Sequence, residues 1–365
     1  MKRRQIKVAI VGVGNCASSL IQGIYFYDKT DKNNVSLGLL HNSIGGYKPM
    51  DIRIVAAFDI DERKVSKDVS EAIFAKPNNT KIFQRNIPKC GVKVLRGPTL
   101  DGYPEHFNNY DKNIRPVESI EKEVDVIKIL KKIKPDILIN YLPVGSQKAS
   151  EYYAQACIDA EVSFVNAIPV FLCSTEQWSS KFTKKGLVCA GDDIKSQVGA
   201  TIIHRVLANL FKERGVKLTR TYQLNIGGNT DFLNMVEESR LLNKRISKTE
   251  AVQSQLAVPL EKENIHIGPS DFVEWLHDNK VCYITMEGKG FGNMPITLDL
   301  KLSVEDSPNS AGVMIDVIRV CKLALDKGQK GYLSEISAFA FKHPSRQYSD
   351  DEAIQKLENF IRKYS

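Results

Sequence analysis

The stretch VAIVGVGNCASSLIQGIYFY, residues 8–27, predicts how the chain begins to fold. It opens with an apolar run at residues 8–11 that has the length and composition of a buried strand. Two glycines one residue apart, Gly12 and Gly14, follow directly, and the next residues carry the apolar spacing of a helix. The sequence therefore predicts a strand, a glycine loop and a helix in immediate succession.

This order is the context in which the pattern G-x-G-x-x-G/A indicates a dinucleotide site. Glycines permit the tight turn and let backbone N–H groups approach a pyrophosphate, whose negative charge the helix N-terminus favours. A structural turn that holds no cofactor remains the alternative. The residues that the motif predicts to contact NAD are Gly12, Gly14, Asn15, Cys16 and Ala17.

An acidic residue about 20 positions after the glycines usually binds the adenosine ribose. In this chain the second predicted strand, residues 52–58, leads instead to Asp59, which lies 45 residues beyond Gly14. A loop inserted at residues 28–50, rich in Asn and Gly, explains the delay. Asp59 is the predicted ribose ligand, and a carboxylate there favours NAD over NADP.

Apolar strands alternate with amphipathic helices through the first half of the chain, which predicts a Rossmann-like, doubly wound parallel sheet. Strands are expected at residues 8–11, 52–58, 92–95, 137–141, 163–167 and 187–190. Helices are expected at residues 124–133, 148–160 and 175–184.

The pattern changes after Asp193. A helical stripe of apolar residues occupies residues 197–215, and residues 296–305 alternate strictly between apolar and polar side chains. Such alternation is typical of a half-buried strand in an antiparallel sheet with one open face. We therefore expect a second α+β domain with a largely antiparallel sheet, which serves catalysis and oligomerisation.

A last long helix is predicted at residues 307–328, with Ser307 as its N-cap and Gly328 just past its end. We expect it to return to the first domain. The predicted division is residues 1–199 plus 310–365 for the dinucleotide-binding domain and residues 200–309 for the catalytic and oligomerisation domain.

Composition excludes several classes of protein. The 365 residues are 42% hydrophobic and 26% charged, as in globular proteins, and no apolar run approaches the roughly 20 residues of a membrane span. Seven cysteines include no C-x-x-C pair, which argues for a reduced, cytoplasmic protein without a structural zinc site. The net charge of +8 comes from dispersed lysines and arginines, so a nucleic-acid partner is not expected.

Two polar segments are candidate binding loops. GDDIKSQVGATIIHR, residues 191–205, places Ser196 and Gln197 between a strand and a helix, where they would either bind a phosphate or cap the helix. QLNIGGNTDFLNM, residues 223–235, either lines a hydroxyl-rich ligand or forms a turn.

LLNKRISKTEA, residues 241–251, places Lys244 and Lys248 one helical turn apart. Both ammonium groups would then reach one site, or both would lie on a solvated face. The six histidines are scattered, so the sequence offers no metal-ligand spacing.

Taken together, these segments resemble the myo-inositol-1-phosphate synthase family, and the glycine loop is similar to that of its bacterial and archaeal members. The segments occur in the family's order: VAIVGVGNCASSLIQG, FDID, NYLPVGS, GDDIKSQVGAT, LNIGGNTDFLN, KRISK, IHIGPSD, EDSPNSAG and AFAFKHP.

The resemblance implies conversion of D-glucose 6-phosphate to 1L-myo-inositol 1-phosphate, an isomerisation in which NAD is reduced and reoxidised within one turnover. C5 is oxidised to a ketone, C6 loses a proton, the enolate attacks the C1 aldehyde and hydride returns to C5. The resemblance also implies a homotetramer, and it leaves a divalent metal ion open as a second cofactor.

Site residues implied by the resemblance fall on the family's motifs. The catalytic positions are Lys244, Lys248, Lys342, Asp193, Asp231, Asp271 and Asp306, with Lys280 in place of a family lysine that is missing after Asp271. Asp193 would also contact NAD, and Ser196, Gln197, Asn225 and Asn229 would bind the substrate. The alternatives are an NAD-dependent sugar-phosphate dehydrogenase that releases NADH and an inactive NAD-binding scaffold; the retained lysines favour the synthase.

Overall fold

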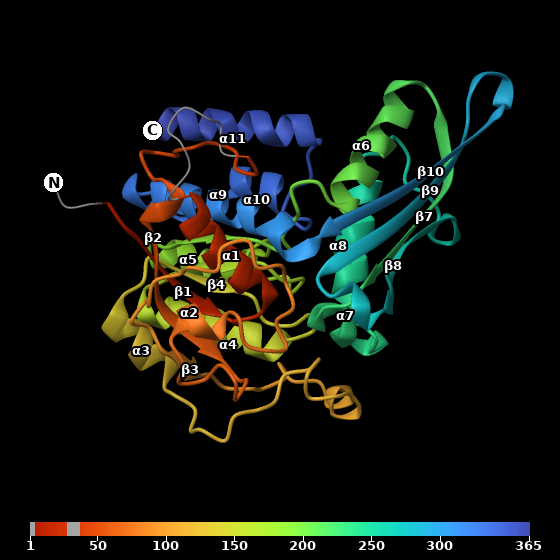
Figure 1. Cartoon of the computed structure of the whole chain (residues 1–365). Coiled ribbons are helices and arrows are strands. Elements are labelled where there is room, and N and C mark those ends of the chain that lie inside the picture. The colour runs from red at the N-terminus through yellow and green to blue at the C-terminus, as the bar shows by residue number, and fades with distance from the viewer. Residues whose placement is uncertain (1–3, 28–36) are drawn as a thin grey trace.

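The computed structural model of the chain describes residues 4–27 and 37–365. It contains a parallel sheet wrapped by helices and, beside it, a smaller mixed sheet that ends in a protruding hairpin (Figure 1). Of the predicted loop at residues 28–50, residues 28–36 lie outside the described part of the chain.

Seven strands form the larger sheet in the order β11-β6-β5-β4-β1-β2-β3, and each pairs with its neighbour in parallel. The strands are β1 (Ile6–Val11), β2 (Ile52–Asp59), β3 (Val94–Arg96), β4 (Ile137–Asn140), β5 (Ser163–Asn166), β6 (Val188–Ala190) and β11 (Gly331–Tyr332). The predicted doubly wound parallel sheet is confirmed. Its six predicted strands differ from the observed ones by one or two residues at their ends, and β11 was not predicted.

Each face of this sheet carries its own layer of helices. Alternate side chains of β1 point to opposite faces, so that Val8 and Ile10 join one apolar core while Ala9 and Val11 join the other. The first core packs under α1 (Asn15–Phe26), α9 (Asp306–Asp326), α10 (Ser334–Ala340) and α11 (Asp350–Tyr364). The second packs under α3 (Val126–Ile133), α4 (Gln147–Ala160) and α5 (Glu176–Lys184), and the short α2 (Val69–Ala72) lies before β3.

The smaller sheet has the order β10-β9-β7-β8, with β9 antiparallel to both of its neighbours and β8 parallel to β7. Its strands are β7 (Lys217–Gly227), β8 (Ile265–Phe272), β9 (Asn279–Lys289) and β10 (Pro295–Glu305). Two helices, α6 (Ala200–Glu213) and α8 (Leu242–Gln253), pack on one face, and α7 (Thr230–Asn234) follows β7. The predicted alternation is present in β10, where Leu298, Leu300 and Leu302 are half-buried between exposed polar residues.

The last long helix begins one residue earlier than predicted and is not capped by Ser307. Strand β10 leads straight into α9, so Glu305 is the N-cap and Asp306 is already helical. The N–H of Asp306 donates to the carbonyl oxygen of Asp278, 2.9 Å away, which ties the start of the helix to the start of β9. The helix then packs along α1, as the predicted return to the parallel sheet requires.

Candidate active site

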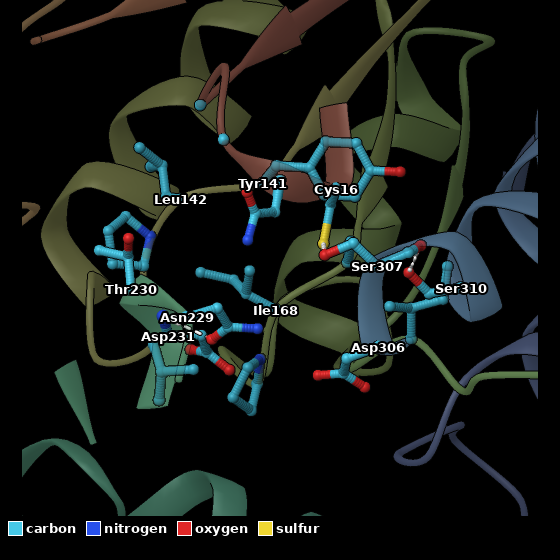
Figure 2. A pocket seen from close by; sticks show the side chains of 18 of the residues that line it. Cys16, Tyr141, Leu142, Ile168, Asn229, Thr230, Asp231, Asp306, Ser307 and Ser310 are labelled. Atoms are coloured by element: carbon cyan, nitrogen blue, oxygen red, sulfur yellow. Dashed lines mark hydrogen bonds between the residues drawn. The ribbon is translucent and has the colours of Figure 1, made fainter. Parts of the chain in front are cut away.

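A long pocket follows the carboxyl edge of the parallel sheet. It passes the ends of β1, β2, β4 and β5, and the strand order reverses between β1 and β4. Ligands of doubly wound sheets bind in the crevice at such a reversal. Figure 2 shows Tyr141 and Cys16 beside the glycine loop, Asp231 at the start of α7 and Asp306 at the start of α9, all around this cavity.

The glycine loop forms the floor of the pocket at the start of α1. Gly12 has a φ of +88°, and a Cβ at this position would lie 2.5 Å from the carbonyl oxygen of Tyr141. Gly14 is the N-cap of α1, and among the described residues, apart from its two chain neighbours, no atom lies within 4 Å of a Cβ built on it. The backbone next to Gly14 is therefore open to a ligand at a helix N-terminus. Gly12, Gly14, Asn15 and Cys16 line the pocket, whereas Ala17 is buried in the core beneath it.

Asp59 lies at the end of β2 with its carboxylate held by the backbone. Oδ2 accepts the N–H of Val13 at 2.6 Å, and Oδ1 accepts the N–H groups of Ile60 and Asp61 at 2.7 and 2.8 Å. The ammonium of Lys64, a residue the sequence analysis did not select, lies 3.9 Å from Oδ2. Lys64 is buried and also lines the pocket.

Three lysine–aspartate pairs form the wall opposite the glycine loop. Lys244 Nζ lies 2.7 Å from Asp231 Oδ2, Lys280 Nζ lies 3.0 Å from Asp306 Oδ1, and Lys342 Nζ lies 2.7 Å from Asp193 Oδ1. The pairs connect α8 to α7, β9 to α9, and the segment after α10 to the segment after β6. All six residues line the pocket.

The fourth lysine differs from these three. Within the described part of the chain, Lys248 has no carboxylate within ion-pair distance and no hydrogen bond, although it is only 4% exposed and lines the pocket. Burial, followed by the charges of Lys280, Lys244 and Lys342, holds its pKa well below the usual 10.5. A lysine in this state holds its proton weakly and can act as a proton acceptor.

The lysine–aspartate pairs shift the pKa values of their own members. Burial would raise the pKa of Asp193, but Lys342, Lys244 and hydrogen bonds from Lys342 and Ser247 lower it below its usual value. Asp306 is kept ionised in the same way by Lys280. Burial lowers the pKa of Lys342 despite Asp193, whereas Asp306 outweighs burial and raises the pKa of Lys280.

The predicted phosphate loop separates into residues that reach the pocket and one that does not. Ser196 lies before α6 and lines the pocket together with Gly199, Ala200 and Thr201 of the helix N-terminus. Gln197 is not among the lining residues. Its amide donates to the carbonyl oxygen of Gly38, and its N–H donates to the carbonyl oxygen of Asn309 at 2.9 Å.

The asparagines after β7 have structural partners as well as a place in the pocket. Asn225 is buried and its Nδ2 donates to the carbonyl oxygen of Gly268 at 2.7 Å. Asn229 caps α7 by accepting the N–H groups of Asp231 and Phe232. Both asparagines line the pocket, so capping and ligand contact are compatible at Asn229.

Asp271 is not brought to the pocket. It ends β8 on the exposed surface, where its Oδ1 accepts the N–H of Phe272 at 2.8 Å. Asp278, seven residues later, is 1% exposed and receives hydrogen bonds from residues that line the pocket. Asp278 is not among the residues predicted from the sequence, in which its one signal is its position two residues before Lys280.

The donor set does not fit a resident metal ion. No group of three His, Cys, Asp or Glu side chains suited to a metal occurs in residues 4–27 and 37–365. Asp193, Asp231 and Asp306 each pair with an ammonium group instead. His204 is buried against Thr221 and Gln223, and burial lowers its pKa to about 4, as expected of a packed histidine.

Fold and pocket define a doubly wound α/β protein whose parallel-sheet edge faces three lysine–aspartate pairs. A family model described as myo-inositol-1-phosphate synthase matches residues 199–307. The chain is 52% identical to the inositol-3-phosphate synthase of Mycolicibacterium smegmatis, with 98% of each chain covered. It is 50% identical to the inositol-3-phosphate synthase of Corynebacterium glutamicum, with 99% of each covered. The chain belongs to the myo-inositol-1-phosphate synthase family, so the resemblance predicted from its ordered motifs is confirmed.

A solved structure extends the agreement to the fold. The myo-inositol-1-phosphate synthase-related protein from Thermotoga maritima superposes with a TM-score of 0.82, covering 98% of this chain and 99% of its own. At 23% identity this likeness concerns the fold alone. In the described residues, no helix combines the length and apolar character needed to cross a bilayer.

Proposed function

We propose that this chain is an NAD-dependent inositol-3-phosphate synthase that converts D-glucose 6-phosphate to 1L-myo-inositol 1-phosphate. The observation that carries the proposal is the group of four lysines that line the pocket opposite the glycine loop, two buried and two partly buried, three paired with aspartates and one unpaired. Membership of the family supports the same activity.

NAD fits the first part of the pocket. The open backbone at Gly14 and the N-terminus of α1 suit a pyrophosphate, and the close approach of Gly12 to Tyr141 leaves no room for a side chain. Asp59 at the end of β2 is placed for the ribose hydroxyls. Bound NAD would supply the hydride acceptor at C5 and later the hydride donor. Because the carboxylates of the lysine wall are already paired with ammonium groups, no step is assigned to a metal ion.

The sugar phosphate fits the second part. Ser196 and the N-terminus of α6 offer a hydroxyl and backbone N–H groups to the phosphate, and α6 is 14 residues long. Asn225 and Asn229 then face the sugar hydroxyls. Lys248 lies on the same wall and would complete the phosphate end or contact the adjoining carbon atoms.

The lysines suit the charge changes of a cyclisation. A ketone at C5 acidifies the hydrogens at C6, and negative charge then develops on the C5 oxygen during enolisation and on the C1 oxygen during ring closure. Fixed ammonium groups stabilise such charge in a site that excludes water, and one such donor is worth about 3 kcal/mol of barrier. We assign proton transfer from the C5 hydroxyl to Lys248, whose pKa is lowered, and charge stabilisation to Lys244, Lys280 and Lys342.

The test is a product assay with the purified protein, D-glucose 6-phosphate and catalytic NAD. Phosphorus NMR should show the inositol phosphate resonance, and absorbance at the NADH band should stay flat after a small initial rise. Sustained accumulation of NADH in proportion to consumed sugar would instead establish the dehydrogenase. No turnover of either kind would favour the inactive scaffold.

We also propose a homotetramer whose contacts use the smaller sheet and its helices. Val206 and Leu210 on α6 are 51% and 45% exposed, and they belong to the predicted apolar stripe of this helix. Phe291 and Met294 are exposed at the tip of the β9–β10 hairpin, which extends away from the parallel sheet (Figure 1). A second copy of the chain would cover these apolar side chains.

The domain division and the cellular location are proposals of the same kind. We assign residues 1–199 plus 310–365 to cofactor binding and residues 200–309 to catalysis and oligomerisation. All seven cysteines are free, which suits the reducing cytoplasm.

A further inference from the structure

Asp278 receives hydrogen bonds from three separate parts of the fold. It lies between the 3-10 turn η6 (Glu274–Leu276) and β9, and it is 1% exposed. Its Oδ1 accepts from Asn15 Nδ2 at 3.1 Å, from Asn229 Nδ2 at 2.9 Å and from Ser307 Oγ at 2.9 Å. Its Oδ2 accepts the N–H of Ser307 at 3.2 Å. We call these four residues the Asp278 network.

The donors begin three helices that surround the pocket. Asn15 is the first residue of α1, directly after the glycine loop. Asn229 caps α7, which carries Asp231, and Ser307 follows Asp306 in the first turn of α9. One buried carboxylate thus connects the predicted NAD loop to the two aspartates that pair with Lys244 and Lys280.

A second connection runs parallel to the first. Asn15 Oδ1 accepts the N–H groups of Asn79 and Thr80 at 2.8 and 3.2 Å. Asn79 Nδ2 in turn donates to the carbonyl oxygen of Gly228 at 2.9 Å, next to Asn229. The side chain of Asn15 is therefore fixed on both sides: its Nδ2 donates to Asn79 Oδ1 at 2.7 Å as well as to Asp278, and Asp278 is the acceptor that links it to α7 and α9.

We propose that Asp278 is a positioning residue, which holds the glycine loop against the lysine–aspartate wall so that the nicotinamide and the sugar carbon stay in reacting geometry. This inference rests on the proposed function. Displacements of about 1 Å between reacting groups cost up to 100-fold in rate, so a carboxylate that fixes this distance affects catalysis without touching the substrate.

The ionised form of Asp278 is the form that fits the network. A protonated carboxyl would turn one oxygen into a donor and place it against Asn15, Asn229 or Ser307, which are donors themselves. The titratable groups that interact with Asp278 are Asp306 on α9 and the thiol of Cys16 on α1. Lys280, two residues later in β9, pairs with Asp306.

Burial and then the charge of Asp306 raise the pKa of Asp278 to about 6, against the opposing hydrogen bonds from Thr80, Asn229 and Ser307. The network should therefore weaken as the pH falls through about 6.

The test compares Asp278→Asn and Asp278→Ala with Asp159→Asn, which removes an exposed carboxylate from α4. We expect both Asp278 variants to lose at least 50-fold in kcat while the KM for glucose 6-phosphate changes less than fivefold. The wild type and Asp159→Asn should show a decline of kcat below about pH 6 that is absent in Asp278→Asn.

A double-mutant cycle keeps the proposal testable if Asp278→Ala folds poorly. Asn15→Ala and Asp278→Asn break the same connection, so the double variant should be no slower than the slower single variant. Additive losses, or an Asp278→Asn enzyme with kcat within threefold of wild type, would overturn the positioning role. Absence of inositol phosphate from the wild-type reaction would instead refute the proposed function, so the two failures are distinct.

Discussion

At the scale of single residues, Lys248 is the most unusual side chain in the pocket. It is buried among Lys244, Lys280 and Lys342, and no carboxylate in the described residues pairs with it. An unpaired buried ammonium destabilises the folded protein, so an apolar side chain of similar length would relieve that cost. The position therefore combines a stability cost with a location suited to proton transfer.

Replacing Lys248 with Met tests the stability cost and the role in proton transfer separately. Lys248→Met should lower kcat at least 1,000-fold through loss of the proton acceptor, while the melting temperature rises and the Kd for NAD, measured by isothermal titration, stays within twofold of wild type. The exposed Lys184→Met at the end of α5 is the matched control and should change none of the three. Unchanged turnover in Lys248→Met would remove Lys248 from the mechanism.

Asp278 gives a prediction on stability. Its pKa of about 6 in the folded protein exceeds the ordinary 3.8, so between these values the folded state binds more protons than the unfolded state. Its contribution to the free energy of unfolding therefore falls as the pH rises, by about 2 kcal/mol between pH 4.5 and 7.5. Relative to wild type, Asp278→Asn should gain about this much over the same interval in urea titrations. An equal difference at both pH values would contradict the raised pKa.

Site residues were predictable from the sequence where a nearby pattern, such as helical spacing or the end of a strand, marks them. Lys244 and Lys248 were found because a four-residue spacing implies one helix face, and Asp59 because it ends a strand. Asp278 and Lys64 lie in connections without periodicity, and only tertiary contacts bring them to the pocket. The family motif predicted Asp271 as a catalytic residue, but Asp271 lies on the surface. The turn η6 separates the end of β8 from β9, the strand that carries Lys280 into the pocket.

At the scale of elements, the geometry of the glycine loop and the start of α1 gives the most specific prediction about cofactor binding. Both glycines are required, for different reasons. Gly12 has a left-handed φ, and a Cβ there would clash with the backbone of Tyr141. Gly14 has an extended conformation, and beyond its chain neighbours no atom in the described part of the chain lies within 4 Å of its Cβ position. A side chain at Gly14 would therefore fill the space that we propose for the pyrophosphate.

Gly14→Ala should leave the melting temperature within 1 to 2 °C of wild type and raise the Kd for NAD at least tenfold, because the methyl group occupies ligand space rather than protein space. Calorimetric titration of NAD and a thermal melt of the free protein measure the two effects. Gly12→Ala, by contrast, should destabilise the free protein as well. Tight NAD binding by Gly14→Ala would place the cofactor elsewhere.

Element boundaries were predictable where the period of apolar residues is continuous. Strand β1 and helices α3, α4 and α5 begin and end within two residues of their predicted limits. The apolar stripe of α6 was also predicted, but its spacing does not identify what packs against it. Ala208 and Phe211 pack against the smaller sheet, whereas Val206 and Leu210 are exposed. Periodicity identifies an apolar face, and the partner of that face is a property of the assembly.

At the scale of the whole molecule, these exposed side chains predict the oligomeric state. Val206→Glu combined with Leu210→Glu should reduce the mass measured by light scattering from that of a tetramer to that of a dimer or monomer, because buried charge disfavours the contact. The pair Lys212→Glu and Arg214→Glu on the same helix and its C-cap is the matched control and should keep the wild-type mass. A monomeric wild type would refute the homotetramer.

The contact between α1 and α9 has a consequence for the geometry of the site. Gly23 on α1 lies so close to α9 that an added Cβ would be 3.3 Å from Ile315 Cδ1. Both helices point their first residues into the pocket, one with the glycine loop and the other with Asp306. A methyl group inserted at this crossing would require Ile315 Cδ1, the end of a side chain, to move by a few tenths of an ångström. At 1.5 Å rise per residue, the crossing lies about 12 Å from the start of α1. The close packing of α1 on α9 thus holds the glycine loop and Asp306 at a fixed separation from a point well outside the pocket.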